Sequence, residues 1–474
     1  ALTVLADAAA LVRRHGDPGF RVDAIPLDDP LTGAMLARGE TIGVFQCESS
    51  GAQRTLRQLK VRTVQDLAVA NAFFKPGPAL GGMAQHFIRR YRGEEPVRFL
   101  HPALEPILRR TQGVLIFQEQ VLRIAREIAG LSWVEADSLR KGMSKFQSAE
   151  MEAMRERFVV GCQRAAPDGP ALSEPQARAL WEQVAPFAGY GFNQGHATAY
   201  ADVSYRSAYV RAHWPTAFLA ARLANWGGFH HPAIYIAEAR RLGIGVCPPH
   251  INFSNSEFTL VPATKSAGPV LYMGLNQVRD LRQTSVQAIL AERSRAPFGS
   301  LADLLRRVSL QRKEIAHLIQ CGALDGLGEH RAALLDEVEC NAAAGAQQVA
   351  FAFMAQQTLP EDAAQRLEWE QHILGQPVSV QPLELWPQVG DGCVALAGVA
   401  AMPRQSVRVA GMRLPGWIGG KGFYLSDGVN FCSAVPPRGV NNPPAWAVLR
   451  IRGRWLEEEW GGGWLQIEAM ERVR

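Results

Sequence analysis

The chain has 474 residues, of which 47% are hydrophobic and 20% are charged, and its net charge is +5. This length exceeds what a single hydrophobic core holds, so we expect several domains. No bilayer-length apolar run, secretory signal pattern or C-x-x-C pair occurs, which argues against a membrane protein, an exported disulfide framework and a zinc ribbon, and predicts a cytoplasmic protein.

Residues 1–262 are expected to form a mainly helical domain. Amphipathic patterns recur in it, for example at 120–131 and 150–165. Ser173 stands three residues before Gln176, the spacing of a capping box at a helix start.

Two places in this region are candidate anion sites. Arg140, Lys141 and Lys145 put three cations into six residues, although such a cluster is commonly a solvated basic face. Asn193 is positioned to cap the helix that follows, and His196 would lie in its first turn, where helix N-termini bind anions. The alternative for the second place is a capped helix with a packed histidine.

Two other stretches carry less information. Lys75 lies in the proline- and glycine-rich stretch 73–82, which predicts a rigid turn that could still place a functional group. The apolar run 111–120 ends in Gln118, Glu119 and Gln120, and the sequence alone assigns these three residues no role.

Residues 263–340 predict two helix–hairpin–helix units, at 274–295 and 309–339. The glycine hairpin at 322–328 could offer backbone N–H groups to DNA phosphates. In the first unit Asp280 stands where a glycine is usual, and a plain pair of helical hairpins is the alternative. The candidate DNA contacts are Arg279, Arg282, Arg312, Lys313, Gly326 and Gly328.

Residues 341–388 read as a linker, because they begin with a stretch that is rich in Ala and Gln and poor in large aliphatic residues. Within it, QVAFAF (348–353) is an apolar hexapeptide of the kind that docks in a partner's groove. A short edge strand or a packed linker is the alternative.

Residues 389–474 predict a small barrel of OB type, with strands at 393–402, 408–417, 421–435, 445–459 and 462–473. Alternate positions place Arg450, Arg452 and Arg454 on one face of a strand. Cations interleaved with aromatic residues suit single-stranded nucleic acid, although three glutamates follow at once.

Five motifs occur in an order that resembles one family. They are FQCESSGAQ (45–53), FFKPGPALGG (73–82), GVLIFQEQV (113–121), ADSLRKGMSK (136–145) and FAGYGFNQGHATAYADVSYRSAYVRAHWP (187–215). The chain resembles the C-terminal half of the alpha subunit of bacterial DNA polymerase III, a C-family DNA polymerase. The resemblance implies a multidomain α+β chain: mainly α-helical fingers, a helix-hairpin-helix region, a clamp-binding segment and an all-β OB-type barrel.

The resemblance also implies roles for residues. Nucleotide contacts are expected from Arg140, Lys141, Lys145, Asn193, His196 and Arg206. Contacts to the β sliding clamp are expected from Gln348, Val349, Phe351 and Phe353. To the hairpin residues named above it adds Lys75, Arg450 and Arg452 as DNA contacts. The implied partners are primer–template DNA, deoxynucleoside triphosphates, the clamp and other replicase subunits.

One departure from the family pattern concerns the metal ligands. C-family polymerases hold two Mg²⁺ ions on palm aspartates that include an Asp-x-Asp pair, and this sequence contains no Asp-x-Asp. Asp28 and Asp29 are adjacent, so on an extended segment they would point to opposite sides. We therefore expect a fragment that is inactive alone, within a parent that uses Mg²⁺. The alternatives are an error-prone paralogue and a stand-alone, non-catalytic nucleic-acid-binding protein.

Overall fold

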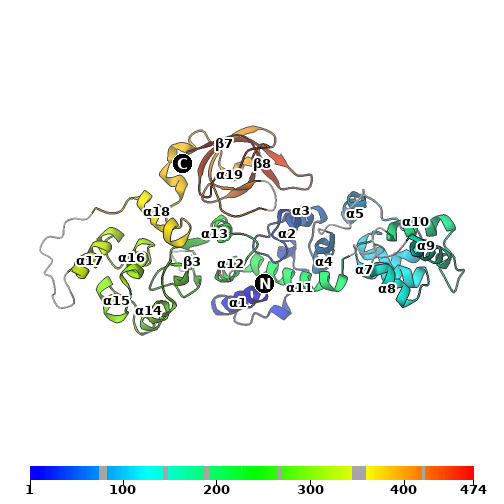
Figure 1. The fold of residues 1–474 in the computed structure, drawn as a ribbon, viewed down its shortest axis with the longest axis horizontal. Helices are drawn as coiled ribbons and strands as arrows, with labels where there is room; N and C mark the ends of the chain where they lie inside the picture. The colour runs from blue at the N-terminus through cyan, green and yellow to red at the C-terminus, as the bar shows by residue number, and fades with distance from the viewer. Residues whose placement is uncertain are drawn as a thin grey trace. The chain divides into compact units, whose positions relative to one another are not determined.

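The fold was analysed in a computed structural model (Figure 1). It describes residues 1–73, 83–141, 148–185, 192–225, 227–263, 268–343, 359–418 and 422–473. The chain divides into two units: Val22–His213 forms one, and Ala1–Arg21 with Trp214–Arg474 forms the other. No helix in the described ranges is both long enough and apolar enough to cross a membrane.

The Val22–His213 unit is built around the long helix α11 (Gln194–His213). Helices α2 (Pro30–Arg38) and α4 (Val64–Phe73) pack against it, and α3 (Ser50–Leu59) packs on both α2 and α4 (Figure 1). Tyr205 of α11 is fully buried, and its hydroxyl lies within hydrogen-bond distance of the carbonyls of Asp29 and Arg62. α11 is therefore fixed along its second half by the segments that flank α2 and α4.

A second group of helices in this unit has its own apolar core. It comprises α6 (Glu105–Leu108), α7 (Gln118–Arg123), a π-helical turn (Ile124–Ile128), α8 (Trp133–Lys141), α9 (Ser148–Cys162) and α10 (Glu174–Val184), with α5 (Met83–Tyr91) before them. Leu139, Phe158 and Leu180 are fully buried in it. Ser173 and Gln176 form the predicted capping box at the start of α10. The helical character predicted for this region is confirmed.

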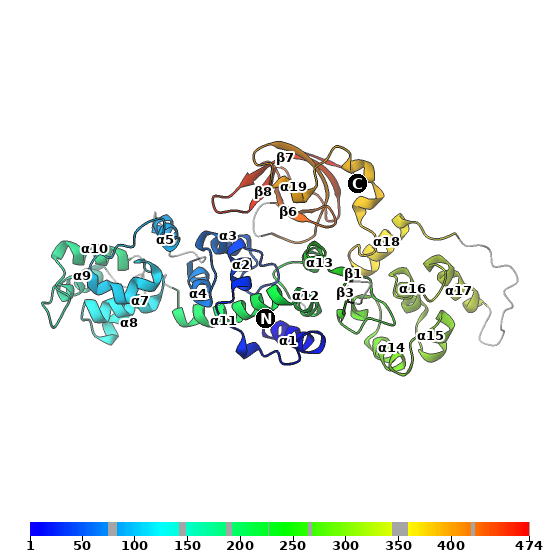
Figure 2. The ribbon, with the colours of Figure 1, turned by 180° about the vertical axis from the view of Figure 1, so that it is seen from behind.

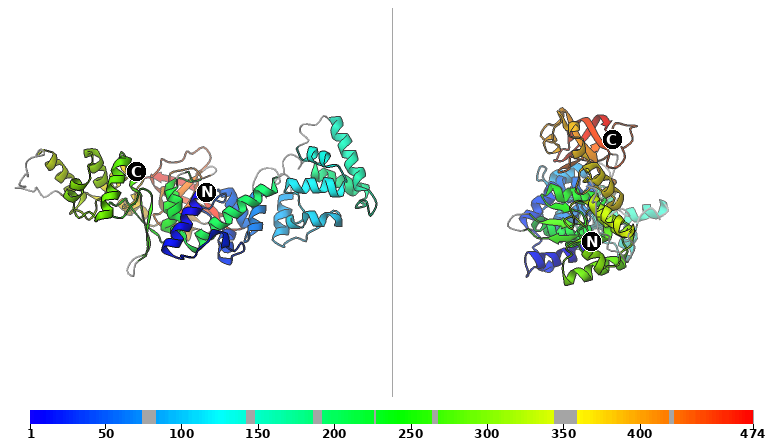
Figure 3. Two further views of the ribbon diagram at one scale, coloured as in Figure 1. Left: turned by 90° about the horizontal axis from the view of Figure 1, so that it is seen from below. Right: turned by 90° about the vertical axis from the view of Figure 1, so that its left-hand side faces the viewer.

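The other unit begins with α1 (Leu2–His15), dark blue in Figure 3, which packs against α12 (Pro215–Ala224). Helix α13 (Pro232–Arg241) follows. A small sheet then forms in the order β1 (Gly245–Cys247), β3 (Val270–Tyr272), β2 (Thr259–Val261). Strand β1 is parallel to β3, and β2 is antiparallel to it.

The two helix–hairpin–helix units come next (Figure 2). The first leads from a 3-10 turn (Leu275–Gln277) into α14 (Gln283–Arg295), and α15 (Leu301–Arg307) follows it. The second consists of α16 (Arg312–Gln320) and α17 (Arg331–Ala343). Helix α18 (Ala363–Leu374) lies in the range predicted as linker and packs against α16.

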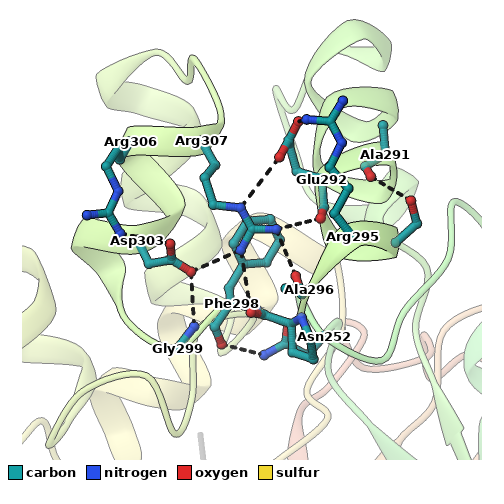
Figure 4. Close-up of polar contacts among 12 residues, drawn as sticks. Asn252, Ala291, Glu292, Arg295, Ala296, Phe298, Gly299, Asp303, Arg306 and Arg307 are labelled. Atoms are coloured by element: carbon teal, nitrogen blue, oxygen red, sulfur yellow. Dashed lines mark hydrogen bonds and ion pairs between the residues drawn. The ribbon is translucent and has the colours of Figure 1, made fainter.

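Arg307 fastens the connection between α14 and α15 (Figure 4). Its guanidinium lies 4.4 Å from the centroid of the Phe298 ring, pairs with Asp303 at 3.0 Å and donates to the carbonyl of Ala296 at 2.7 Å. Asn252 and Phe298 exchange two hydrogen bonds below it. This cation is thus a structural element of the hairpin region.

The C-terminal strands close into a barrel in the order β4 (Ser406–Arg413), β5 (Phe423–Ser426), β6 (Phe431–Val435), β8 (Gly463–Arg472), β7 (Val448–Glu457). Two short 3-10 turns (Pro382–Leu385 and Pro387–Gly390) precede it. Five strands and a barrel agree with the prediction, but two strand assignments were wrong.

Residues 393–402 contain the short helix α19 (Leu396–Val399) in place of a strand, because Leu396 and Val399, three residues apart, both face the barrel core. Residues 421–435 form two strands, because the chain turns at Asp427–Asn430, where Gly428 has a φ of +97°.

Candidate functional site

Two side chains fix the first turn of α11. Asn193 caps the helix, since its Oδ1 accepts the backbone N–H of His196 at 2.7 Å. The carboxylate of Glu119 accepts the N–H of Gln194 at 2.8 Å. Two N–H groups that a helix N-terminus could offer to an anion therefore already have protein acceptors. A phosphate at this place has to be bound mainly by side-chain donors.

The segment that supplies Glu119 is itself paired with the start of α11. The N–H of Gln118 donates to the carbonyl of Phe192 at 3.0 Å, and the N–H of Phe192 donates to the carbonyl of Ile116 at 3.2 Å. The buried amide of Gln120 holds the turn into α7, because its Oε1 accepts the N–H groups of Ile116 and Phe117. Backbone hydrogen bonds thus hold the start of α7 next to the start of α11.

Arg140 reaches this junction from α8. Its Nε and Nη2 donate to Asp137 at 2.9 and 2.7 Å, and its Nη1 donates to Oε1 of Gln118 at 3.3 Å. The side chain keeps 29% of its surface exposed. Because Gln118 directly precedes Glu119, the structure places Arg140 beside the start of α11. In the sequence, Arg140 and the start of α11 are more than 50 positions apart.

The exposed imidazole of His196 belongs to a row of rings. Its centroid lies 5.5 Å from that of Phe192 and 4.1 Å from that of Tyr200. Tyr200 in turn stacks on Phe45 at 5.4 Å, with ring planes 22° apart. The motif that contains Phe45 therefore meets α11 at this row, next to Gln46, whose φ is +60°.

Sequence reasoning missed Gln118, Glu119, Tyr200 and Phe45 as parts of this site. The i,i+4 spacing of His196 and Tyr200 on one helix was a usable signal. The polar end of the run 111–120 was a weaker one. Nothing in the spacing indicated Phe45, because its contact with α11 is made by tertiary packing.

Of the other residues predicted to bind the nucleotide, the structure describes only the side chain of Arg206, and it lies away from this junction. Arg206 is ten residues beyond His196 on α11, or about 15 Å along the helix. Its guanidinium pairs with Asp202 at 2.9 Å and donates to the carbonyl of Val22. Lys141 is the last residue of α8 and its side chain is not described. Lys145 lies outside the described residues, as does the predicted DNA contact Lys75.

Protein groups bind the carboxylate of Asp29, which the sequence placed beside Asp28. Asp29 caps α2 through Thr32 and pairs with His213 at 3.0 Å. Burial alone would raise the pKa of Asp29, but the hydrogen bonds from His213 and Thr32 hold it below its usual value. No group of three or more His, Cys, Asp or Glu side chains that could hold a metal ion occurs among the residues that the structure describes.

Most of the hairpin cations predicted to contact DNA have acidic partners. Lys313 pairs with Asp280 at 2.9 Å, Arg282 with Glu314 at 2.8 Å, and Arg312 with Glu339 at 3.7 Å. The exposed Arg279 lies 3.5 Å from Nδ1 of His372 on α18. The pairs of Lys313 and Arg312 are more than 40% exposed at both partners, whereas Glu314 is buried.

The second hairpin borders a cavity of about 210 Å³ lined by Gly326, Gly328, His330, Arg331 and Arg366, among others. Arg331 is buried and pairs with Asp325 at 2.8 Å and with Glu370 at 3.4 Å. Glu361 accepts the N–H of Ala332 at 3.0 Å. Carboxylates from α18 and the segment just before it thus hold the start of α17.

Arg450, Arg452 and Arg454 alternate along β7 with buried residues, as predicted, but they do not share one set of partners. Arg450 donates to the carbonyls of Gln388 and Val389, just before the barrel. Arg452 and Arg454 both face Glu468 of β8, at 3.7 and 2.5 Å. The exposed Trp417 lies 6.2 Å from the ring of Phe229. The predicted clamp contacts Gln348, Val349, Phe351 and Phe353 lie outside the described residues.

Two family models match this chain. Residues 1–166 match the bacterial DNA polymerase III alpha subunit finger domain, and residues 243–334 match a helix-hairpin-helix motif. The first match includes Glu119 and Arg140. The second includes both hairpins.

Several curated proteins are similar to it. DNA polymerase III subunit alpha of Thermus aquaticus is 40% identical over 351 residues, covering 71% of this chain and 27% of that protein. The corresponding subunit of Saccharopolyspora erythraea is 32% identical over 87% of this chain and 37% of its own length. An error-prone DNA polymerase of Bordetella bronchiseptica is 39% identical over 70% of this chain and 31% of its own length. The chain therefore spans only about a third of the length of these relatives.

Proposed function

The chain belongs to the family of bacterial DNA polymerase III alpha subunits, and we propose that it forms the nucleotide-closing and DNA-holding part of a replicative DNA polymerase. One observation supports this most directly. Arg140 and the capped start of α11 meet through Gln118 and Glu119. A partly exposed cation and an exposed imidazole then stand at one junction, where they can donate to the phosphates of an incoming deoxynucleoside triphosphate.

In this proposal the chain binds and orients the nucleotide, and the metal-dependent step uses ligands from elsewhere. Polymerases transfer nucleotides with two metal ions that clamp the attacking and leaving oxygens. The described residues do not fit such a pair of Mg²⁺ ions, and the sequence has no Asp-x-Asp. Arg140 would counter the negative charge that develops on the departing pyrophosphate.

The DNA partners are proposed from the later domains. The two hairpin units would hold the primer–template duplex through its phosphates, and the barrel would guide single-stranded template. The match to a helix-hairpin-helix motif supports the first of these roles. The hexapeptide at 348–353 would dock on the sliding clamp, a proposal that rests on its sequence alone.

A damage-bypass polymerase is the second candidate. The error-prone relative is 39% identical to the chain, close to the 40% of the Thermus aquaticus subunit. We favour the replicative role because the alpha subunit of Saccharopolyspora erythraea matches 87% of the chain. Primer extension across an abasic site by the polymerase that contains this chain separates the two candidates. Efficient bypass would favour the error-prone type.

Arg140→Ala in the polymerase that contains this chain tests the nucleotide site. Hydrogen bonds to charged groups contribute about 1.5–3 kcal/mol, so kcat/KM for the nucleotide should fall by roughly tenfold to a hundredfold. The measurement is steady-state single-nucleotide incorporation on a primed template. Arg178→Ala is the matched control, since Arg178 forms an exposed ion pair with Glu174 on α10. Equal kinetics for the two variants would contradict the assignment, and a stand-alone binding protein would show no synthesis to lose.

A further inference from the structure

The two hairpins share one backbone turn but differ in the residue at its left-handed position. In the second hairpin, Leu327 N–H donates to the carbonyl of Leu324 at 3.0 Å, and Gly326 has a φ of +82°. In the first hairpin, Leu281 N–H donates to the carbonyl of Val278 at 3.3 Å, and Asp280 has a φ of +61°. Glycine adopts this conformation without strain, whereas aspartate is only tolerated there. A carboxylate therefore occupies a position at which the backbone favours glycine.

This carboxylate engages a cation at the start of the neighbouring unit. Oδ2 of Asp280 lies 2.9 Å from Nζ of Lys313, the second residue of α16. Nδ1 of His317, one turn further along α16, lies 3.8 Å from the same oxygen and is 2.7 Å from the carbonyl of Arg279. The hydrogen bond from Lys313 holds the pKa of Asp280 below its usual value, so the carboxylate is charged at neutral pH.

A second carboxylate accepts a hydrogen bond from the backbone of the same hairpin. Glu314, adjacent to Lys313, accepts the N–H of Arg282 at 2.9 Å as well as the Arg282 guanidinium. Hairpin N–H groups and nearby lysines are the donors that bind DNA phosphates without reading sequence. In the first hairpin, the Arg282 N–H and Lys313 are both occupied by acids of the chain itself.

The exposure of the two acids shows which of them DNA could displace. Glu314 is 1% exposed and is enclosed by its partners. Asp280 and Lys313 have 44% and 67% of their side chains exposed, so their ion pair lies at the surface, where a phosphate could reach it from solvent. Exposed ion pairs contribute little to stability, so the pair is not needed for the fold.

We propose that Asp280 is a built-in phosphate substitute that occupies Lys313 and weakens the grip of the first hairpin on duplex DNA. The proposal rests on the proposed function, since it assumes that the hairpins hold a duplex. Asp280 thereby limits the salt-dependent, sequence-independent part of binding. A polymerase that advances along its template gains from this limit, because each additional phosphate contact has to be broken at every step.

The test is duplex binding by the full chain and its Asp280→Asn variant, measured by fluorescence anisotropy with a labelled duplex of about 20 base pairs. Asparagine also tolerates left-handed backbone but leaves Lys313 without its acid. One further phosphate contact steepens the dependence of log K on log salt by about 0.9, which amounts to about eightfold tighter binding at 0.1 M salt than at 1 M. We therefore expect Asp280→Asn to bind about eightfold more tightly than the parent at low salt, and equally at high salt.

Three further variants make the result decisive. Asp280→Asn combined with Lys313→Ala should return to the affinity of the parent, whereas a retained gain would overturn the proposal. Asp280→Gly should repeat the gain with the residue that the backbone prefers, and thermal unfolding confirms that each variant folds. Asp168→Asn, in an exposed loop, changes the net charge equally and should have no effect.

The outcomes separate this inference from the proposed function. If the parent binds duplex and Asp280→Asn binds no more tightly than Asp168→Asn, Asp280 is not a phosphate substitute, while the hairpins remain DNA-binding. If neither the parent nor Asp280→Asn binds duplex at any salt concentration, the proposed role of the hairpins is itself contradicted.

Discussion

At the scale of single residues, Asn193 has two separable properties. Its side-chain oxygen caps α11, and the side chain itself is exposed beside His196. Sequence reasoning identified the cap because cap residues are recognised by local spacing. It could not identify Glu119 as the second acceptor, because Glu119 and Gln194 are 75 positions apart and meet only in the fold.

Substitution of Asn193 should distinguish the cap from a contact with substrate. Asn193→Ala removes the cap and should cost about 1 kcal/mol in the free energy of unfolding, measured by urea denaturation. Asn193→Asp keeps the cap but adds a negative charge where phosphates are proposed to bind. It should leave stability unchanged and raise KM for the nucleotide. Wild-type KM in Asn193→Asp would show that the site does not face phosphates.

At the scale of elements, Glu314 joins the first helix of one hairpin unit to that of the other. Its carboxylate accepts hydrogen bonds from the backbone of Gln311 at the start of α16, from Ser285 on α14 and from Arg282. Burial alone would raise the pKa of Glu314, but these donors lower it to about 2. Arg282 is therefore part of the connection between α14 and α16, whereas the sequence predicted a DNA contact.

The depressed pKa makes this connection sensitive to acid. A carboxyl group whose pKa is lower in the folded chain stabilises the fold above its unfolded pKa, near 4.3. The stabilisation is lost as the pH falls from there toward 2. Glu314→Gln should lower the melting temperature at pH 7 and show a smaller further loss on acidification than the parent. Glu339→Gln, on an exposed pair, is the control and should behave as the parent does.

Some helices and strands were predicted correctly from the sequence pattern, and others were not. Amphipathic spacing predicted the helices at 120–131 and 150–165, and the capping residues Ser173 and Gln176 predicted the start of α10, since both signals are local. The predicted strand at 393–402 is a short helix, because Leu396 and Val399 are three residues apart and can both face the core on a helix but not on a strand. The partners of Arg282 and Lys313 lie more than 30 residues away, and no spacing rule connects them.

At the scale of the whole molecule, the order of the motifs carried the family assignment. Each motif alone could be explained by local structure. The occurrence of all five in the order found in the family could not. The sequence did not indicate that Asp29 caps α2 and pairs with His213, because the pairing with His213 is made across 184 positions. The site at α11 was predicted only in part: Arg140 and the cap Asn193 were named from the sequence, and the segment that joins them was not.

Clamp docking is a prediction at this scale. Replacing Gln348 and Phe353 by Ala in the polymerase that contains this chain should abolish the stimulation of DNA synthesis by the sliding clamp. Distributive synthesis without the clamp should be unchanged, because neither residue is among the predicted nucleotide contacts. Primer extension with and without clamp measures both. Stimulation that survives the double substitution would leave the hexapeptide a linker.

The contacts of α18 set a limit on where such a clamp could be. Glu361 and Glu370 bond to the start of α17, so the chain is anchored to the same helices on both sides of residues 344–358. Residues 344–358 number 15, and a stretch of that length held at both ends can place no residue more than about 25 Å from the nearer end, which is half of its full extension. A partner that docks on residues 348–353 would therefore have to approach within about 25 Å of α17 or α18.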